Sequence, residues 1–310
     1  MVNSGYLISP NSQRSTENHV FLIGEKTTGK ITNIARNLES IRLIYAPIKD
    51  LSEFENIAFY QHQVFEHAFN GSIGAPVHEK LRTGAKVLEF GCGTGVWTTD
   101  VGAEYPNSEF YVIDFITQNS FENITFISFD IHQKLPFPDN EFDYVFSRDK
   151  SNFFTKDSFQ GFLSEILRVL KSGGWLEIGH PLLRIDDFVL GPTLSRIDAA
   201  YVSWYRENGV HLDLILHLEE HLQMTRKTEY ISSQIAVIPI GGGDFGEFFS
   251  EFILYKMKLL KEFIAPFMGI SFEEYDRLKG EVENELKEQC GEVYCKYKKV
   301  LARKKDIRHS

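Results

Sequence analysis

The chain has 310 residues, of which 43% are hydrophobic and 14% aromatic, and it carries a formal net charge of -10. A chain of this length buries about three quarters of the surface that it exposes when unfolded, so it needs neither disulfide bonds nor a metal ion to fold. The negative charge argues against a nucleic-acid backbone or an anionic membrane surface as the principal partner, because both attract basic patches.

The cysteines and the amino-terminal sequence suggest where the protein works. Cys92, Cys290 and Cys295 lack the spacing of a disulfide framework or a zinc site, which favours a reducing compartment. The amino terminus has no basic segment followed by an apolar core, and no run of about 18 apolar residues occurs. We therefore expect a soluble protein of the cytoplasm or nucleus, with no metal and with no nucleic-acid or membrane partner.

The amino-terminal part of the chain divides into two segments. Residues 1–40 are rich in Ser, Asn, Thr and Gly and lack periodicity, which predicts a mobile segment ahead of one domain over residues 41–310. Apolar residues at helical spacing over residues 51–70 predict a helix. If this helix forms a lid over a ligand site, Tyr60 and His62 contact the ligand. The alternative is a packing helix with a hydrogen-bonded histidine.

A glycine-rich turn organises the rest of the chain. The apolar run of residues 87–90 predicts a buried strand, Gly91, Gly93 and Gly95 follow it, and a helix is expected over residues 96–104. Glycine tolerates positive φ and lets the backbone come close to a ligand, and the start of a helix offers unpaired N–H groups to the same space. The pattern predicts a ligand-binding turn.

The spacing of these glycines excludes a dinucleotide fingerprint. That fingerprint is G-x-G-x-x-G, but its third position holds Val96 when counted from Gly91 and Thr98 when counted from Gly93. A nicotinamide oxidoreductase is therefore disfavoured.

Two acidic residues accompany the glycines. Glu89 lies on the strand before the turn, and Asp114 follows the next predicted strand, residues 109–113. The sequence acidic-x-G-x-G-x-G with a second acid resembles motif I of the class I S-adenosylmethionine (SAM) methyltransferases. SAM has an α-amino group and a ribose diol, and carboxylates suit both. The resemblance implies an α/β, Rossmann-like fold with a seven-stranded, mostly parallel sheet, helices on both faces and helical cap insertions.

The resemblance also implies where the cofactor binds. In these methyltransferases the end of the third strand often holds the adenine, and here the strand predicted over residues 124–129 is followed by Asp130 and Ile131; the alternative for Asp130 is an ordinary turn cap. The expected cofactor-binding residues are Glu89, Gly91, Cys92, Gly93, Gly95, Asp114, Phe115, Asp130, Ile131, Ser147 and Arg148.

Two further strands bring candidate acceptor-site residues to the same edge of the sheet. A turn over residues 135–140 precedes a strand at 142–147, and an amphipathic helix over 157–170, ended by residues 171–174, precedes a strand at 175–178. Ligands of open parallel sheets lie beyond the carboxyl ends of strands. Weak candidates for a general base there are His180, His132 and Asp149, and each also has a structural interpretation.

The remaining chain predicts a cap and the last two strands. Helices are expected within the insertions 190–224 and 245–290, with Tyr201 and Tyr205 as substrate candidates, and strands are expected at 227–240 and 293–302, the last antiparallel. His217 and His221 lie one turn apart but lack a third ligand, so no metal site is predicted.

Several stretches narrow the resemblance to fungal methyltransferases related to regulators and tailoring enzymes of secondary metabolism. They are residues 61–65, 87–97, 104–109, 135–140, 170–177, 190–192, 238–241 and 268–275. The sequence departs from that pattern at residues 241–246 and at His180, so the resemblance does not identify the acceptor. The resemblance implies methyl transfer to a small-molecule acceptor. The alternative is a SAM-binding regulator acting through a protein partner, and a homodimer is also possible under either hypothesis.

Overall fold

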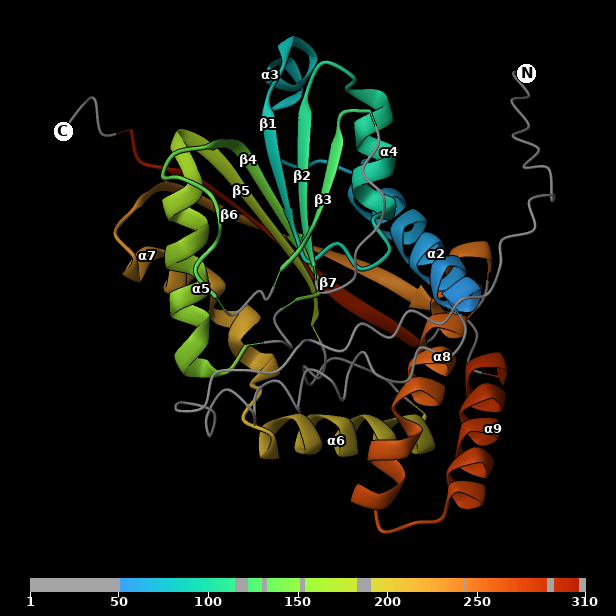
Figure 1. Ribbon diagram of the computed structural model, residues 1–310. Helices are drawn as coiled ribbons and strands as arrows, with labels where there is room; N and C mark the ends of the chain where they lie inside the picture. Colours follow the sequence, from blue (N-terminus) through green and yellow to red (C-terminus); the bar gives the residue numbers. More distant parts are fainter. Residues whose placement is uncertain are drawn as a thin grey trace, which may run out of the picture. The chain divides into compact units, whose positions relative to one another are not determined.

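The computed structural model describes residues 51–114, 122–129, 133–150, 154–182, 191–241, 243–288 and 293–306, all of which belong to one compact unit, residues 40–310. Within these residues seven strands form one sheet in the order β3-β2-β1-β4-β5-β7-β6 (Figure 1). The strands are β1 (Lys86–Phe90), β2 (Glu109–Asp114), β3 (Ile124–Ser128), β4 (Phe142–Arg148), β5 (Leu170–Leu182), β6 (Thr228–Ile240) and β7 (Val293–Lys304).

The direction of the strands confirms the predicted fold. Strands β1 to β5 pair in parallel, whereas β7 pairs antiparallel with both β5 and β6. The strand order reverses between β1 and β4, and open sheets of this kind bind ligands at such a switch point. The chain therefore has the Rossmann-like class I methyltransferase fold, with an antiparallel seventh strand as predicted.

Helices cover the sheet and extend beyond it. They are α2 (Leu51–Phe69), α3 (His78–Thr83), α4 (Val96–Glu104), α5 (Lys156–Val169), α6 (Pro192–Glu207), α7 (Leu218–Met224), α8 (Gly243–Phe267) and α9 (Phe272–Glu288), with a 3₁₀ helix at Leu212–His217. None of the helices described is both long enough and apolar enough to cross a membrane.

Three apolar clusters hold these elements together. One buries α5 and α7 against one face of the sheet, and a second buries α4 against the other face. The third joins α2, α6, α8 and α9 to the ends of β6 and β7, and Figure 1 shows α6, α8 and α9 gathered beyond the carboxyl ends of the parallel strands. We call these last three helices the cap.

Two local features differ from the sequence-based expectation. The six-residue helix α3 was not predicted, because it is too short for an apolar period to repeat. Strand β5 begins at Leu170, so the stretch 171–174 continues the strand instead of separating it from α5. Gly173 has a φ of +74°, and the register between β5 and β4 shifts nearby. Glycine therefore permits an irregular start of β5 at residues 171–174, where the sequence predicted the end of a helix and a loop.

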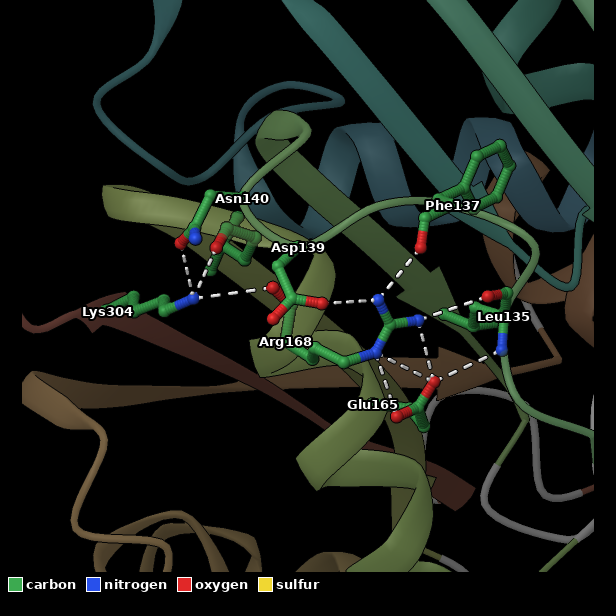
Figure 2. Close-up of polar contacts among 8 residues, drawn as sticks. Leu135, Phe137, Asp139, Asn140, Glu165, Arg168 and Lys304 are labelled. Carbon is green, nitrogen blue, oxygen red and sulfur yellow. Dashed lines mark hydrogen bonds and ion pairs between the residues drawn. The ribbon is translucent and has the colours of Figure 1, made fainter.

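Arg168 closes the turn that leads into β4 (Figure 2). Its guanidinium donates to the backbone oxygens of Phe137 at 2.8 Å and Leu135 at 3.0 Å, and to Glu165 at 2.9 Å. Glu165 in turn accepts from the backbone N–H of Leu135 at 3.1 Å. This network fixes the predicted turn 135–140 at the amino end of β4, opposite the edge where the glycine-rich turn lies.

Candidate functional site

The glycine-rich turn has the geometry that its sequence predicts. Gly91, Gly93 and Gly95 have φ values of +75°, +58° and +73°, in the left-handed region that favours glycine, and Gly95 caps the start of α4. The N–H of Gly91 donates to the backbone oxygen of Ile113 at 2.8 Å, which ties the turn to β2. A Cβ atom on Gly93 would meet no other atom within 4 Å. The turn therefore borders open space at its centre.

Both predicted acids lie at this turn, in different surroundings. Asp114, 2% exposed, accepts a hydrogen bond of 2.8 Å from the N–H of Gly93, and the ammonium of Lys150 lies 3.8 Å from the same carboxylate oxygen. Glu89, 4% exposed, accepts from the hydroxyl of Thr98 in the first turn of α4. Burial raises the pKa of Glu89 from 4.5 to about 7, so its charge is expensive in the free protein.

Cys92, between Gly91 and Gly93 in the turn, is a neutral thiol. Its Sγ donates to the backbone oxygen of Gly93 at 3.5 Å, and burial raises its pKa well above the ordinary value. A thiol of this kind is a poor nucleophile because the thiolate is the reactive form. Cys92 therefore contributes to the turn through its backbone and its size.

The two residues that end β4 contact β1 and α2. Ser147 is buried and its hydroxyl donates to the backbone oxygen of Phe90 at 3.0 Å, which joins β4 to the end of β1. The guanidinium of Arg148 stacks over the ring of Phe65 at 4.9 Å, and its Nη1 lies 3.3 Å from Nδ1 of His62. Arg148 thus links the sheet to α2.

A polar cluster around Asp149 lies beside the glycine-rich turn, at the carboxyl ends of β4 and β5. The carboxylate of Asp149 accepts from the amide of Gln61 at 2.6 Å and from the hydroxyl of Tyr297. Nδ1 of His180 lies 3.9 Å from it. The ammonium of Lys256, on α8, also acts on Asp149, and burial is the main reason that the pKa of Asp149 is raised and that of Lys256 lowered. The cluster joins the sheet, α2 and the cap.

His180 is the least satisfied side chain of this cluster. It is 3% exposed, and neither ring nitrogen has a hydrogen-bond partner among the residues that the structure describes. Burial, with Lys256 and Lys150 nearby, lowers its pKa to about 3, so the ring is neutral at pH 7. Buried polar groups without partners are rare, and such a group calls for an explanation.

His62 takes part in a hydrogen-bonded bridge. It lies with Glu66 and Asp100 in a group whose ligand atoms are within 4.8 Å of one another, as a metal site would require. However, a guanidinium can only donate, so Nδ1 accepts from Arg148 at 3.3 Å, and Nε2 faces the carboxylate of Asp100 at 3.4 Å. Both ring nitrogens of His62 thus have partners within the protein, so we interpret the group as a bridge between α2, α4 and β4.

The other lid and substrate candidates are packed against aromatic residues. Tyr60 stacks on Phe248 with ring centroids 4.4 Å apart, which joins α2 to α8. Tyr201 and Tyr205 are buried in the core of the cap, and the hydroxyls of Tyr201 and Tyr275 lie 3.1 Å apart. Phe115, Asp130, Ile131 and His132 lie outside the described residues.

Sequence reasoning missed a buried ion pair under α2. Glu177 accepts from the N–H groups of Gly74 at 2.8 Å and Ala75 at 3.0 Å, and Lys299 lies 3.9 Å away. These two side chains also line a small pocket between α2 and the sheet. Sequence reasoning also missed Lys150. The strand-end rule, by which ligands lie beyond the carboxyl ends of parallel strands, could have found this residue, because it directly follows the candidate Asp149.

A comparison with known protein families matches the part of the chain that contains the glycine-rich turn. Residues 87–174 match the family described as "Methyltransferase domain". The demethylmenaquinone methyltransferase of Staphylococcus aureus is 32% identical over 169 residues, which cover 48% of this chain and 64% of that protein. The chain thus spans less than two thirds of the length of this curated relative. The resemblance to fungal enzymes of secondary metabolism stays a prediction.

Solved structures are similar at low identity. Phosphoethanolamine N-methyltransferase 2 of Haemonchus contortus, with S-adenosyl-L-methionine bound, is 18% identical with a TM-score of 0.45, over 84% of this chain and 61% of that one. The YcgJ protein of Bacillus subtilis is 16% identical with a TM-score of 0.46, over 72% and 93%. At these scores the likeness adds nothing to the topology described above.

Proposed function

We propose that the chain is a SAM-dependent methyltransferase that acts on a small-molecule acceptor. One observation carries the proposal: three left-handed glycines and the carboxylate of Asp114 form a turn with open space at Gly93. This turn lies inside the segment that matches the methyltransferase domain family, residues 87–174.

The residues at the turn fit SAM. The cofactor is a cation with an ammonium group, a sulfonium and a ribose diol. The turn offers two carboxylates, glycine backbone that carries no side chain of its own, and the N–H groups at the start of α4. Asp114 would hold the ribose diol, and Glu89 would favour the cationic end. From the resemblance, Asp130 and Ile131 stay proposals for holding the adenine, and Phe115 stays a proposal for cofactor binding. The bound cofactor supplies an activated methyl group, so the protein has chiefly to orient the acceptor and exclude water.

The acceptor would bind at the cluster of Asp149 and His180, below the cap. The neutral ring of His180 can accept a hydrogen bond from an acceptor hydroxyl, which would satisfy a buried nitrogen that otherwise has no partner. Lys256 would favour an acceptor that carries negative charge on oxygen. The name of the curated relative, demethylmenaquinone methyltransferase, supports a small organic acceptor.

Calorimetric titration of the purified chain with SAM and with S-adenosylhomocysteine tests the donor site. We expect both to bind to the wild-type protein and Gly93→Val to abolish binding, because the new side chain fills the cofactor space. Gly269→Val is a matched control, since Gly269 has a φ of +70° and open space around its Cβ position, but it lies in the turn after α8. A folded wild-type protein that binds neither ligand would refute the proposal.

A further inference from the structure

Lys150 lies across the glycine-rich turn. A Cβ atom built on Gly91 would lie 2.5 Å from Cε, 2.6 Å from Cδ and 2.7 Å from Cγ of Lys150. The stem of this lysine therefore fills the space that the missing side chain of Gly91 leaves open. That is the space where a ligand of the turn would approach the backbone.

The backbone of Asp149 aims Lys150 at the turn. Asp149 has a φ of +60°, in the left-handed region that few residues other than glycine adopt, although aspartate enters it more readily than most. Its N–H donates to the backbone oxygen of Gly179 at 2.9 Å, and its carboxylate is held by Gln61 and Tyr297. Three contacts from three elements, β5, α2 and β7, thus hold Asp149 in this conformation, and left-handed residues other than glycine are often found at functional sites.

The charge of Lys150 balances the acids of the turn. Its ammonium lies 3.8 Å from Asp114, and the side chains are 12% and 2% exposed. Its charge also favours the ionised form of Glu89, against the larger opposing effect of burial. An internal cation therefore stands where the proposed cofactor would bring its own cationic groups.

We propose that Lys150 is an internal counter-ion of the cofactor site, which SAM displaces when it binds, so that this residue sets the cofactor affinity. The inference rests on the proposed function. Binding must break the contact of Lys150 with Asp114 and move its stem off Gly91, and this cost weakens the binding of both SAM and S-adenosylhomocysteine. The alternative is a permanent counter-ion that stays in place in the complex.

Calorimetric titration of three variants separates the two. Lys150→Met keeps a stem of similar length without the charge, Lys150→Ala removes both, and Lys156→Met changes an exposed lysine at the start of α5 as a control. Since a partly buried ion pair is worth about 1 kcal/mol, we expect Lys150→Met to bind both ligands about fivefold more tightly. Lys150→Ala should bind more tightly still, and Lys156→Met should match the wild type.

Thermal unfolding gives a second readout that needs no acceptor. The free Lys150→Met protein should melt below the free wild type, because Asp114 loses its counter-ion, whereas the two proteins saturated with S-adenosylhomocysteine should melt together. Equal or weaker ligand binding by both Lys150 variants would overturn the inference while leaving the proposed function intact. A wild-type protein that binds neither ligand would overturn both.

Discussion

Replacing Glu89 by glutamine tests the electrostatics of the turn. Burial raises the pKa of this carboxyl from 4.5 to about 7, although the hydroxyl of Thr98 donates to it. A glutamine keeps an oxygen that can accept from Thr98 and removes the buried charge. We therefore expect Glu89→Gln to stabilise the free protein and to weaken the binding of SAM.

The size of the effect follows from the pKa. Between pH 4.5 and 7 the unfolded chain releases the proton of Glu89 while the folded chain keeps it, so wild-type stability falls as the pH rises. A shift of about 2.5 units at about 1.4 kcal/mol each corresponds to about 3 kcal/mol at pH 7 and above, as an upper bound. The stability gain of Glu89→Gln should therefore approach this value at pH 8 and vanish near pH 4.5.

Ligand binding should respond in the opposite direction. A cationic ligand favours the ionised carboxylate, so the affinity of the wild type for SAM should fall up to about tenfold for each pH unit below 7, while Glu89→Gln should bind weakly with little pH dependence. Denaturant unfolding and calorimetric titration from pH 5 to 8 measure the two effects, with Glu109→Gln, an exposed acid on β2, as control. Parallel stability curves for the wild type and Glu89→Gln would show that the charge of Glu89 is not costly.

Two other substitutions separate stability from function. Arg168→Met removes the hydrogen bonds to the backbone oxygens of Leu135 and Phe137, so denaturant unfolding should show that the free energy of unfolding falls by about 2 to 3 kcal/mol. Calorimetry should show an unchanged affinity for SAM. A large loss of affinity would contradict the separation of the turn 135–140 from the site. His180→Phe removes two buried ring nitrogens that have no hydrogen-bond partners among the described residues, so the free energy of unfolding of the free protein should rise by about 1 kcal/mol or more. Methyl transfer should be lost. A destabilised protein with full activity would contradict the proposed role of His180.

The sequence predicts the geometry of the glycine-rich turn well because its signals are local. The glycines of the turn, the apolar run before them and the helix after them all lie within residues 86–104, and each signal depends only on near neighbours. The sequence also places Glu89 and Asp114 at the turn. It does not predict that Glu89 is buried beneath it, since that depends on how α4 packs against β1 and brings the hydroxyl of Thr98 to the carboxylate.

The cluster around Asp149, where we propose that the acceptor binds, is only partly predictable, because its residues come from distant segments. The strand-end rule found Asp149 and His180, but Tyr297, Gln61 and Lys256 join them only through the pairing of β7 with β5 and the packing of α2 and α8. Tyr297 lies on the last strand and no local pattern marks it.

These two sides of the site have different origins in the chain. The turn, Asp114 and Lys150 lie within residues 87–174, which match the methyltransferase domain family. His180, Lys256 and Tyr297 lie after that segment, and Gln61 lies before it. The partners of Asp149 come from α2, the cap helix α8 and the last strand, and α2, α8 and Tyr297 belong to the third apolar cluster, separate from those of the two sheet faces. If the proposed function is right, substitutions in the cap should change which acceptor is methylated while leaving SAM affinity within about twofold of the wild type, because distant sites contribute nearly independently.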